Sequence, residues 1–318
     1  MEALHYTNPL ILQRADPYVY RHTDGWYYFT ASVPSYDRIE LRRAKTIAQL
    51  ADATPCTVWS KHESGDMSQH IWAPELHYLD GCWYLYFAAS RADDIWRLRP
   101  YVLKCTGQDP LTDAWEECGM MQAADGDDKT FVDFSLDATV FENRGKRYLC
   151  WAEKTGGQFG ASNLYLAEME SPTKLKTPQF MLTTPDYDWE RVGFWVNEGP
   201  AVIHNNGKIY IVYSASATGA CYCMGMMEAS ETADLLDRNS WTKQRYPVCS
   251  TDAQKKIYGP GHNSFTVAED GVTPLCIYHA RPYEEIIGDP LYDPNRHTMV
   301  MKLKFDAEGR PVFDFNEV

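Results

Sequence analysis

The feature that most constrains the fold is a short motif that recurs five times along the 318 residues: a turn containing glycine, then an aromatic or β-branched run. Two clear copies are Asp24-Gly25-Trp26-Tyr27-Tyr28-Phe29 and Asn206-Gly207-Lys208-Ile209-Tyr210-Ile211. The turn glycines are Gly25, Gly81, Gly145, Gly207 and Gly271, so successive copies are 56, 64, 62 and 64 residues apart. A glycine turn between two such runs is typical of a β-hairpin. Regular spacing of this length indicates a repeat architecture.

Each copy is followed by a third strand-like run, and in most copies an outer aromatic residue lies beyond it. The third runs are 39–41, 101–103, 164–166, 224–226 and 299–301, and the outer aromatics are Trp59, Trp115, Trp241 and Phe313. Four-stranded sheets repeated radially form a β-propeller, and little helical periodicity is present. We therefore predict an all-β fold, a five-bladed β-propeller with four-stranded antiparallel blades around a central axis. Because no linker rich in Pro, Gly or Ser divides residues 1–318, we expect a single catalytic domain.

An ionisable residue lies near the start of the first strand in every repeat. These residues are Asp16, Glu75, Asp137, Glu198 and His262, at −9, −6, −8, −9 and −9 relative to the turn glycines. The first strand of each propeller blade lines the central channel. We therefore expect four carboxylates and one histidine to enter one small axial region.

Clustered carboxylates restrict the chemistry of such a site. Burial and like charge raise the pKa of at least one of them. One protonated carboxylic acid beside one ionised carboxylate is the arrangement that hydrolyses a glycosidic bond. A calcium cage is the main alternative use of the same side chains. Gly-x-Ser-x-Gly, phosphate-loop and His-Glu-x-x-His motifs are not found in the sequence, so acid–base hydrolysis is favoured.

Composition restricts partners and location. The formal net charge of −14 argues against binding nucleic acid. No window reaches 18 consecutive apolar residues, so no membrane span is predicted. The nine cysteines are scattered, and Met1-Glu2-Ala3-Leu4-His5 lacks the basic and apolar regions of a signal peptide. We therefore predict a cytoplasmic protein, or a secreted one whose signal has been removed, and leave the oligomeric state open.

Six segments together carry a family resemblance. They are Arg14-Ala15-Asp16-Pro17, His70-Ile71-Trp72-Ala73-Pro74-Glu75, Ser135-Leu136-Asp137-Ala138, Val196-Asn197-Glu198-Gly199-Pro200, Gly261-His262-Asn263-Ser264 and Asn295-Arg296-His297. With these segments in this order, the chain resembles glycoside hydrolase family 43, the five-bladed propellers that cleave arabinose and xylose linkages with inversion.

The resemblance implies a role for each matching residue. Asp16 would be the general base that activates water, and Glu198 the general acid that protonates the leaving oxygen. Asp137 would orient that acid and tune its pKa, with Arg296 beside Asp137 and the bound sugar. An inverting enzyme needs about 6.5–9.5 Å between its two carboxyl groups to hold the water. Glu75 is interpreted as structural.

Further residues are candidates for ligand binding. In the family, the residue matching His262 often binds an axial metal ion, commonly calcium, directly or through water; a hydrogen-bonded buried histidine is the alternative. No cofactor is required for the chemistry. Trp72 could stack on the sugar, and Phe134, Phe194 and Trp195 flank catalytic residues and could wall the pocket.

The resemblance also suggests a substrate. Many β-xylosidases of this family carry a C-terminal β-sandwich, and these 318 residues leave no room for one. The segments 189–198 and 214–218 look most like enzymes that release single arabinose units from α-1,5-arabinan. We therefore expect an exo-α-1,5-L-arabinofuranosidase acting on arabinan-derived oligosaccharides. An endo-α-1,5-arabinanase, a β-xylosidase and a non-catalytic glycan-binding propeller are the alternatives.

Overall fold

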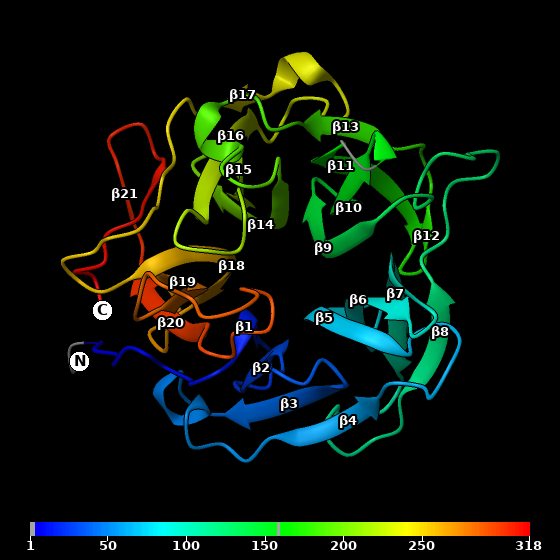
Figure 1. Cartoon of the computed structure of the whole chain (residues 1–318), viewed down its shortest axis with the longest axis horizontal. Helices are drawn as coiled ribbons and strands as arrows, with labels where there is room; N and C mark the ends of the chain where they lie inside the picture. The colour runs from blue at the N-terminus through cyan, green and yellow to red at the C-terminus, as the bar shows by residue number, and fades with distance from the viewer. Residues whose placement is uncertain (1–3, 158–159) are drawn as a thin grey trace.

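The structure is a computed structural model that describes residues 4–157 and 160–318. Its sheets are arranged as five blades around a central axis, with β1, β5, β9, β14 and β18 nearest the centre (Figure 1). The predicted all-β, five-bladed propeller is confirmed. Among the described residues, no helix is long and apolar enough to cross a membrane.

The blades follow one another along the chain. Blade one contains β1 (Ala15–Arg21), β2 (Tyr27–Ser32), β3 (Arg38–Ala44) and β4 (Cys56–Ser60). Blade two contains β5 (Gln69–Leu79), β6 (Cys82–Arg91), β7 (Asp94–Cys105) and β8 (Glu116–Met120). Blade three contains β9 (Ser135–Asn143), β10 (Lys146–Thr155), β11 (Ala161–Ser171), β12 (Lys174–Leu175) and β13 (Phe180–Thr183). Blade four contains β14 (Asn197–Asn205), β15 (Lys208–Ala215), β16 (Cys223–Ser230) and β17 (Thr242–Lys243). Blade five contains β18 (Tyr258–Val267), β19 (Pro274–Arg281) and β20 (His297–Lys302).

The remaining elements are short and peripheral. They are the two-stranded sheet of β21 (Lys304–Phe305) and β22 (Pro311–Val312), and the 3₁₀ turns η1 (Ala48–Leu50), η3 (Asp188–Glu190) and η4 (Arg238–Ser240).

The prediction of four strands in every blade is wrong for blades three and five, whose sheets have five and three strands. In blade five, the N-terminal segment lies along the outer edge of β20. Leu10 N–H donates to Thr298 O at 2.8 Å, and Thr298 N–H donates to Ile11 O at 2.9 Å. The Asn8 side chain adds two bonds to the backbone of Val300, at 2.7 and 2.8 Å. The start of the chain thus replaces the missing strand and closes the ring, because the same segment leads directly into blade one.

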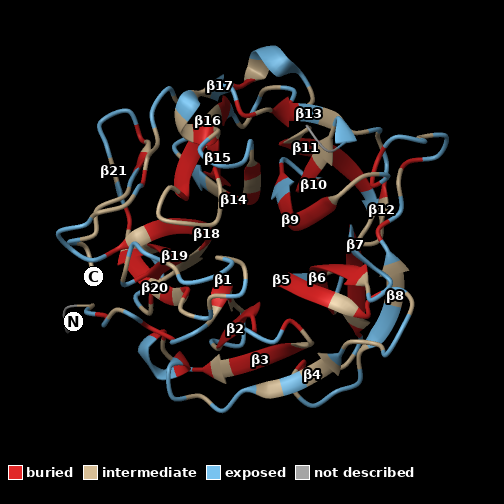
Figure 2. Cartoon of the chain, in the orientation of Figure 1, coloured by how far each residue is buried: buried red, intermediate tan, exposed pale blue. Residues whose placement is uncertain are grey.

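The five turn glycines all have φ between 73 and 79°, the left-handed conformation that glycine adopts without strain. The predicted hairpins are therefore present in every blade. Between the blades lies the core, where buried residues line facing sheets (Figure 2). Tyr28 of blade one packs on Trp83 of blade two with ring centroids 4.9 Å apart, and both are fully buried. Large aromatic side chains thus fill the space between neighbouring blades.

The first strand of every blade carries the same β-bulge. Between two paired positions, the first strand advances by three residues while the second strand advances by two. The bulged residues, all with φ between 44 and 55°, are Asp16, Ala73, Asp137, Gly199 and His262. Glu198 directly precedes the bulged Gly199 and lies at the start of β14, as predicted. Glu75 follows the bulged Ala73 by two and is the seventh residue of β5, so it lies farther along its strand than predicted. A bulge redirects side chains, and here it does so at the axis.

A bulge also frees a backbone N–H from the strand ladder, and four of the five are bonded across a blade boundary. Each donates to a side chain of the preceding blade: Ala73 to Ser32 Oγ (2.8 Å), Gly199 to Asp137 Oδ2 (3.0 Å), His262 to Ser214 Oγ (2.6 Å) and Asp16 to His279 Nδ1 (3.1 Å). Buried N–H groups require such partners. These bonds fix neighbouring blades relative to one another at the axis, where the ionisable residues lie.

Candidate active site

The three predicted catalytic residues lie on or beside the bulges of blades one, three and four. Asp16 Oδ1 is 3.3 Å from both His262 Nδ1 and Arg296 Nη1. The same His262 nitrogen is 3.9 Å from Asp137 Oδ2. Asp137 in turn accepts the N–H of the residue after Glu198. Residues more than 100 positions apart in the sequence therefore form one connected group.

Asp16 is held in its ionised form. Ser32 Oγ donates to Asp16 Oδ2 at 2.6 Å. Burial by itself would raise the pKa of Asp16, but the Arg296 guanidinium and His262 outweigh it and hold the pKa well below its usual range. His279 accepts the N–H of Asp16 through Nδ1, and burial lowers its pKa to about 3. His279 is therefore neutral with its proton on Nε2. An ionised carboxylate with this support can act as a general base.

Asp137 lies in the opposite electrostatic environment. It is buried, and its Oδ2 accepts the Gly199 N–H. Burial raises its pKa to about 8; His262 opposes this shift, while the nearby Glu198 and Asp16 carboxyls add to it. Asp137 thus binds the backbone directly after Glu198, which suits the predicted role of orienting that residue.

Glu198 begins the bulge of blade four and is partly buried. Its Oε1 accepts a hydrogen bond from Tyr222 Oη at 2.8 Å. Burial raises the pKa of Glu198, although the Tyr222 bond and the charge of His262 act in the opposite direction. A carboxyl group that retains its proton toward neutral pH can act as a general acid.

His262 faces the acids directly. Burial disfavours its charged form, but Asp137, Asp16 and Glu198 outweigh this and raise its pKa. Among the described residues, no group of three or more His, Cys, Asp and Glu is arranged to hold a metal ion. The pairing with carboxylates fits the alternative interpretation of a buried, hydrogen-bonding histidine, and calcium at this position remains a prediction.

Arg296 has different partners from those expected. The sequence interpretation placed it beside Asp137, whereas its guanidinium contacts Asp16 and donates from Nη2 to Tyr36 Oη at 2.8 Å. The reason is that Arg296 precedes β20 of blade five, which adjoins blade one when the ring closes. Trp72 lies beyond Tyr36, with ring centroids 5.6 Å apart, and is mostly buried. Trp72 is thus close to the base side of the site.

The other predicted wall residues lie on loops. Phe134 directly precedes β9 and lies 6.5 Å from the exposed ring of Trp96, measured between centroids. Phe194 and Trp195 precede β14 and are 68% and 51% exposed, with Arg191 over the Trp195 ring. Exposed aromatic rings on loops that lead into catalytic strands could contact a sugar, and their substrate-binding role remains a prediction.

Glu75 has a partner of its own. Its Oε2 lies 2.9 Å from His77 Nε2, and both side chains are buried. This local pairing fits the structural interpretation of Glu75.

Sequence reasoning missed Ser32, Tyr36, Tyr222 and His279, each of which touches a predicted site residue. The sequence contains a signal for two of these four residues, Ser32 and His279. Ser32 and Ser214 both lie seven residues after a turn glycine, and His279 lies eight after the last one. Each of these three residues lies on the second strand of its blade and pairs with the first-strand residue directly before the bulged one. Tyr36 and Tyr222 lie outside the strands, where the repeat gives no register.

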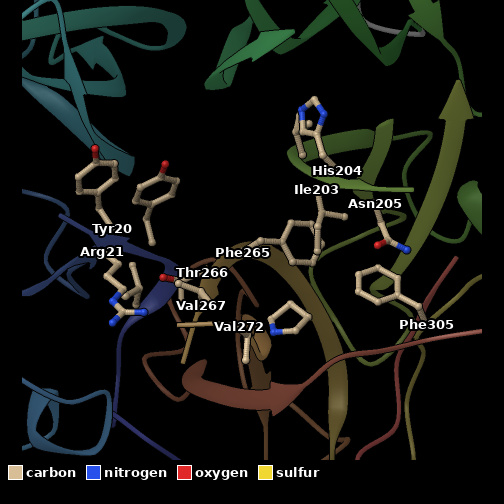
Figure 3. A pocket seen from close by; sticks show the side chains of 14 residues that line it. Tyr20, Arg21, Ile203, His204, Asn205, Phe265, Thr266, Val267, Val272 and Phe305 are labelled. Carbon is tan, nitrogen blue, oxygen red and sulfur yellow. The ribbon is translucent and has the colours of Figure 1, made fainter. Parts of the chain in front are cut away.

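A cavity of about 560 Å³ lies at the other end of the channel. It is surrounded by the far ends of β1, β14 and β18, including Tyr20, Ile203 and Phe265 (Figure 3). Asp16 and Glu198 lie at the beginnings of β1 and β14, so this cavity and the candidate active site are at opposite ends.

Comparisons with known proteins agree with this geometry. The chain is similar to the extracellular exo-α-(1->5)-L-arabinofuranosidases of Streptomyces avermitilis, at 49% identity, and Streptomyces chartreusis, at 51%. The alignments cover 97% and 90% of this chain and 63% and 85% of those proteins. A crystal structure of α-L-arabinofuranosidase from Lactobacillus brevis is 54% identical with a TM-score of 0.92, covering 97% of this chain and 96% of that one.

The predicted cytoplasmic location is wrong: the two Streptomyces relatives are named as extracellular, which points to secretion. The cysteine argument failed for a physical reason. All nine cysteines are free thiols, and five are buried. Thiols that pack as small apolar side chains do so irrespective of the redox compartment.

The model of glycosyl hydrolases family 43 matches residues 6–311, nearly the whole chain. A carbohydrate substrate follows from this match and from the arabinofuranosidase relatives. The resemblance drawn from six short segments is confirmed, and the protein belongs to glycosyl hydrolase family 43.

Proposed function

We propose that this protein is an inverting exo-α-1,5-L-arabinofuranosidase that releases terminal arabinofuranose from arabinan-derived oligosaccharides. The observation that carries the chemistry is the contrast between Asp16 and Glu198. Their surroundings hold the pKa of Asp16 well below its usual range and raise the pKa of Glu198, which favours an ionised base and a protonated acid. Such a pair of carboxyl groups is what inverting hydrolysis requires.

The reaction follows from these protonation states. Asp16 accepts a proton from water as the water oxygen attacks the anomeric carbon. The bond between that carbon and the glycosidic oxygen breaks, and Glu198 delivers its proton to the leaving oxygen. Asp16 ends protonated and Glu198 ionised, so proton exchange with solvent restores the enzyme. Asp137 supports the acid by binding the Gly199 N–H.

The choice of sugar is supported by the relatives' names. Both Streptomyces proteins are called exo-α-(1->5)-L-arabinofuranosidases. Because the chain spans 63% of the Streptomyces avermitilis relative's length, the activity of the whole protein is part of the proposal.

Product analysis tests it. The protein is incubated with linear α-1,5-arabinan, an aryl α-L-arabinofuranoside and an aryl β-D-xyloside, and the products are separated over time. We expect arabinose as the first and main product from arabinan. Long oligosaccharides at early times would indicate endo action, release of xylose alone would indicate a xylosidase, and binding without any product would indicate a non-catalytic propeller.

A further inference from the structure

Tyr222 is a buried residue that sequence reasoning did not assign. It directly precedes β16 and is 2% exposed. Its hydroxyl donates to Oε1 of Glu198 at 2.8 Å. Burial and the nearby Glu198 and Asp137 carboxyls raise its pKa well above the usual value, so the phenol keeps its proton and remains a donor.

The Tyr222 ring is held in place by blade five. It stacks on His279 with centroids 5.6 Å apart and planes 5° apart, and His279 accepts the N–H of Asp16. On β18, the strand paired with that of His279, a Cβ added to Gly261 would lie 2.2 Å from Tyr222 Cε1. Gly261 therefore leaves the space that this ring needs. The position of the hydroxyl is set by packing, independently of its bond to Glu198.

The direction of this bond restricts where Glu198 carries its proton. In a protonated carboxyl group the carbonyl oxygen is a stronger acceptor than the hydroxyl oxygen, so acceptance at Oε1 favours the acidic hydrogen on the other oxygen, Oε2. We propose that Tyr222 is a positioning residue that assigns the transferable proton of Glu198 to Oε2 and stabilises the carboxylate left after transfer. This inference rests on the proposed role of Glu198 as general acid.

The proton balance is simple. The hydrogen on Oε2 moves to the glycosidic oxygen as its bond to the anomeric carbon breaks, and the negative charge remains on the Glu198 carboxylate. Tyr222 donates to that carboxylate more strongly than to the neutral acid, because hydrogen bonds to ionised acceptors are stronger. Its contribution is therefore greatest after the proton has left.

Other charged groups also face Glu198. His262 and Arg296 favour its ionised form, and Asp16 disfavours it. Asp137 disfavours it as well, because the two carboxylates would repel each other. A Tyr222→Phe substitution leaves all four in place and removes one hydroxyl. Any change in the titration of Glu198 can then be assigned to that hydroxyl.

The test is the pH dependence of kcat/KM for Tyr222→Phe on α-1,5-arabino-oligosaccharides. Because the lost bond favours the ionised form, the pKa of Glu198 rises, and the alkaline limb should move about one unit to higher pH. We expect kcat to fall about tenfold while KM changes less than twofold. The fall should be smaller on a 4-nitrophenyl arabinofuranoside, whose leaving group needs less protonation.

Tyr213 offers a matched control in the same blade. Its hydroxyl donates at 2.8 Å to the buried Glu190, outside the group of catalytic residues. Tyr213→Phe removes an equivalent bond and should leave the alkaline limb in place. Gly261→Ala, which keeps the Tyr222 hydroxyl but displaces its ring, should move the limb upward as Tyr222→Phe does.

The outcomes separate the two proposals. If Glu198→Gln keeps the alkaline limb of the parent enzyme, the role of Glu198 is wrong. If Glu198→Gln removes the limb but folded Tyr222→Phe leaves it unmoved, the inference about Tyr222 is wrong while the general acid stands. An equal shift in Tyr213→Phe would also overturn it, because the effect would then belong to the blade and not to the hydroxyl.

Discussion

The two sides of the channel contain the same kind of side chain in opposite states. On the base side, blades one and five surround Asp16 with Arg296, His262 and the Ser32 hydroxyl. On the acid side, blades three and four place Asp137 and Glu198 together. Burial disfavours the ionised form of each of these carboxyl groups. The two sides therefore differ in the neighbouring charged groups that oppose the effect of burial. At Asp16 the Arg296 guanidinium and His262 outweigh burial and lower the pKa, whereas at Asp137 and Glu198 burial prevails and raises the pKa.

The largest effect is expected on the base side. Asp16→Asn removes the group that accepts the proton of water, so we expect kcat to fall about 10⁴-fold. The loss should be similar for arabino-oligosaccharides and for aryl arabinofuranosides, because both need the attacking water. Steady-state kinetics on both substrates checks this. Asp37→Asn, a change at a half-buried residue in the same blade that pairs with Arg38 and not with Asp16, should keep full activity.

For Glu198→Gln, the loss of activity should depend on the leaving group of the substrate. This dependence distinguishes the general acid from the general base. We expect a loss of roughly 10²–10⁴-fold on arabino-oligosaccharides. With 4-nitrophenoxide, a good leaving group that departs without protonation, the loss should be about tenfold or less. Comparing kcat/KM of the variant with that of the parent enzyme on each substrate measures the two losses. Full activity on oligosaccharides, or an equal loss on both, would contradict the assignment of acid and base.

Arg296→Gln should reduce the difference in pKa between Asp16 and Glu198 without abolishing it. The guanidinium holds the pKa of Asp16 low, so its removal lets that pKa rise. A base must be ionised, and the acid limb of kcat/KM should therefore move about one unit to higher pH. Tyr36→Phe, which removes a partner of Arg296 but leaves its charge, should shift the limb less. An unmoved acid limb in Arg296→Gln would show that another group sets the state of Asp16.

The smallest effect is on stability and concerns Asp137. Its folded-state pKa of about 8 lies above the unfolded value of about 4. The folded state is therefore not penalised below about pH 4, loses stability between about pH 4 and 8, and carries the full penalty above that range. Asp137→Asn removes the penalty while its amide oxygen can still accept the Gly199 N–H.

We therefore expect Asp137→Asn to raise Tm by a few degrees at pH 8 and to change it little at pH 4, while catalysis falls. Thermal unfolding followed by circular dichroism across this range tests the prediction. A variant that is equally destabilised at all pH values would show that burial of Asp137 is not costly.

Much of the fold could be read from local patterns. The spacing of Gly25, Gly81, Gly145, Gly207 and Gly271 indicated five hairpins because only the turn chemistry had to be recognised, and each of these glycines has a left-handed φ. The strand count of blade five could not be read in this way. Its outer edge is completed by Leu10 and Ile11, nearly 290 residues from Thr298, and such pairing has no local signal.

The candidate site shows the same division. Asp16, Asp137 and Glu198 were found from short motifs, since the chemistry of a carboxyl group belongs to the residue itself. The contact of Arg296 with Asp16 was not predicted, because which blades adjoin across the closure depends on the whole ring. Tyr222 was missed for a related reason: it lies outside the repeat, and its hydroxyl reaches Glu198 only through packing against Gly261 and His279.

The sequence by itself determined that five similar hairpins would bring acids to one axis, because hydrophobic pattern and turn residues act over a few positions. Only the tertiary structure decided which acid is ionised. That choice depends on burial and on charges contributed by other blades: Arg296 beside Asp16, and Glu198 beside Asp137. Electrostatic interactions act through space over a few ångströms, and those distances exist only once the ring has closed.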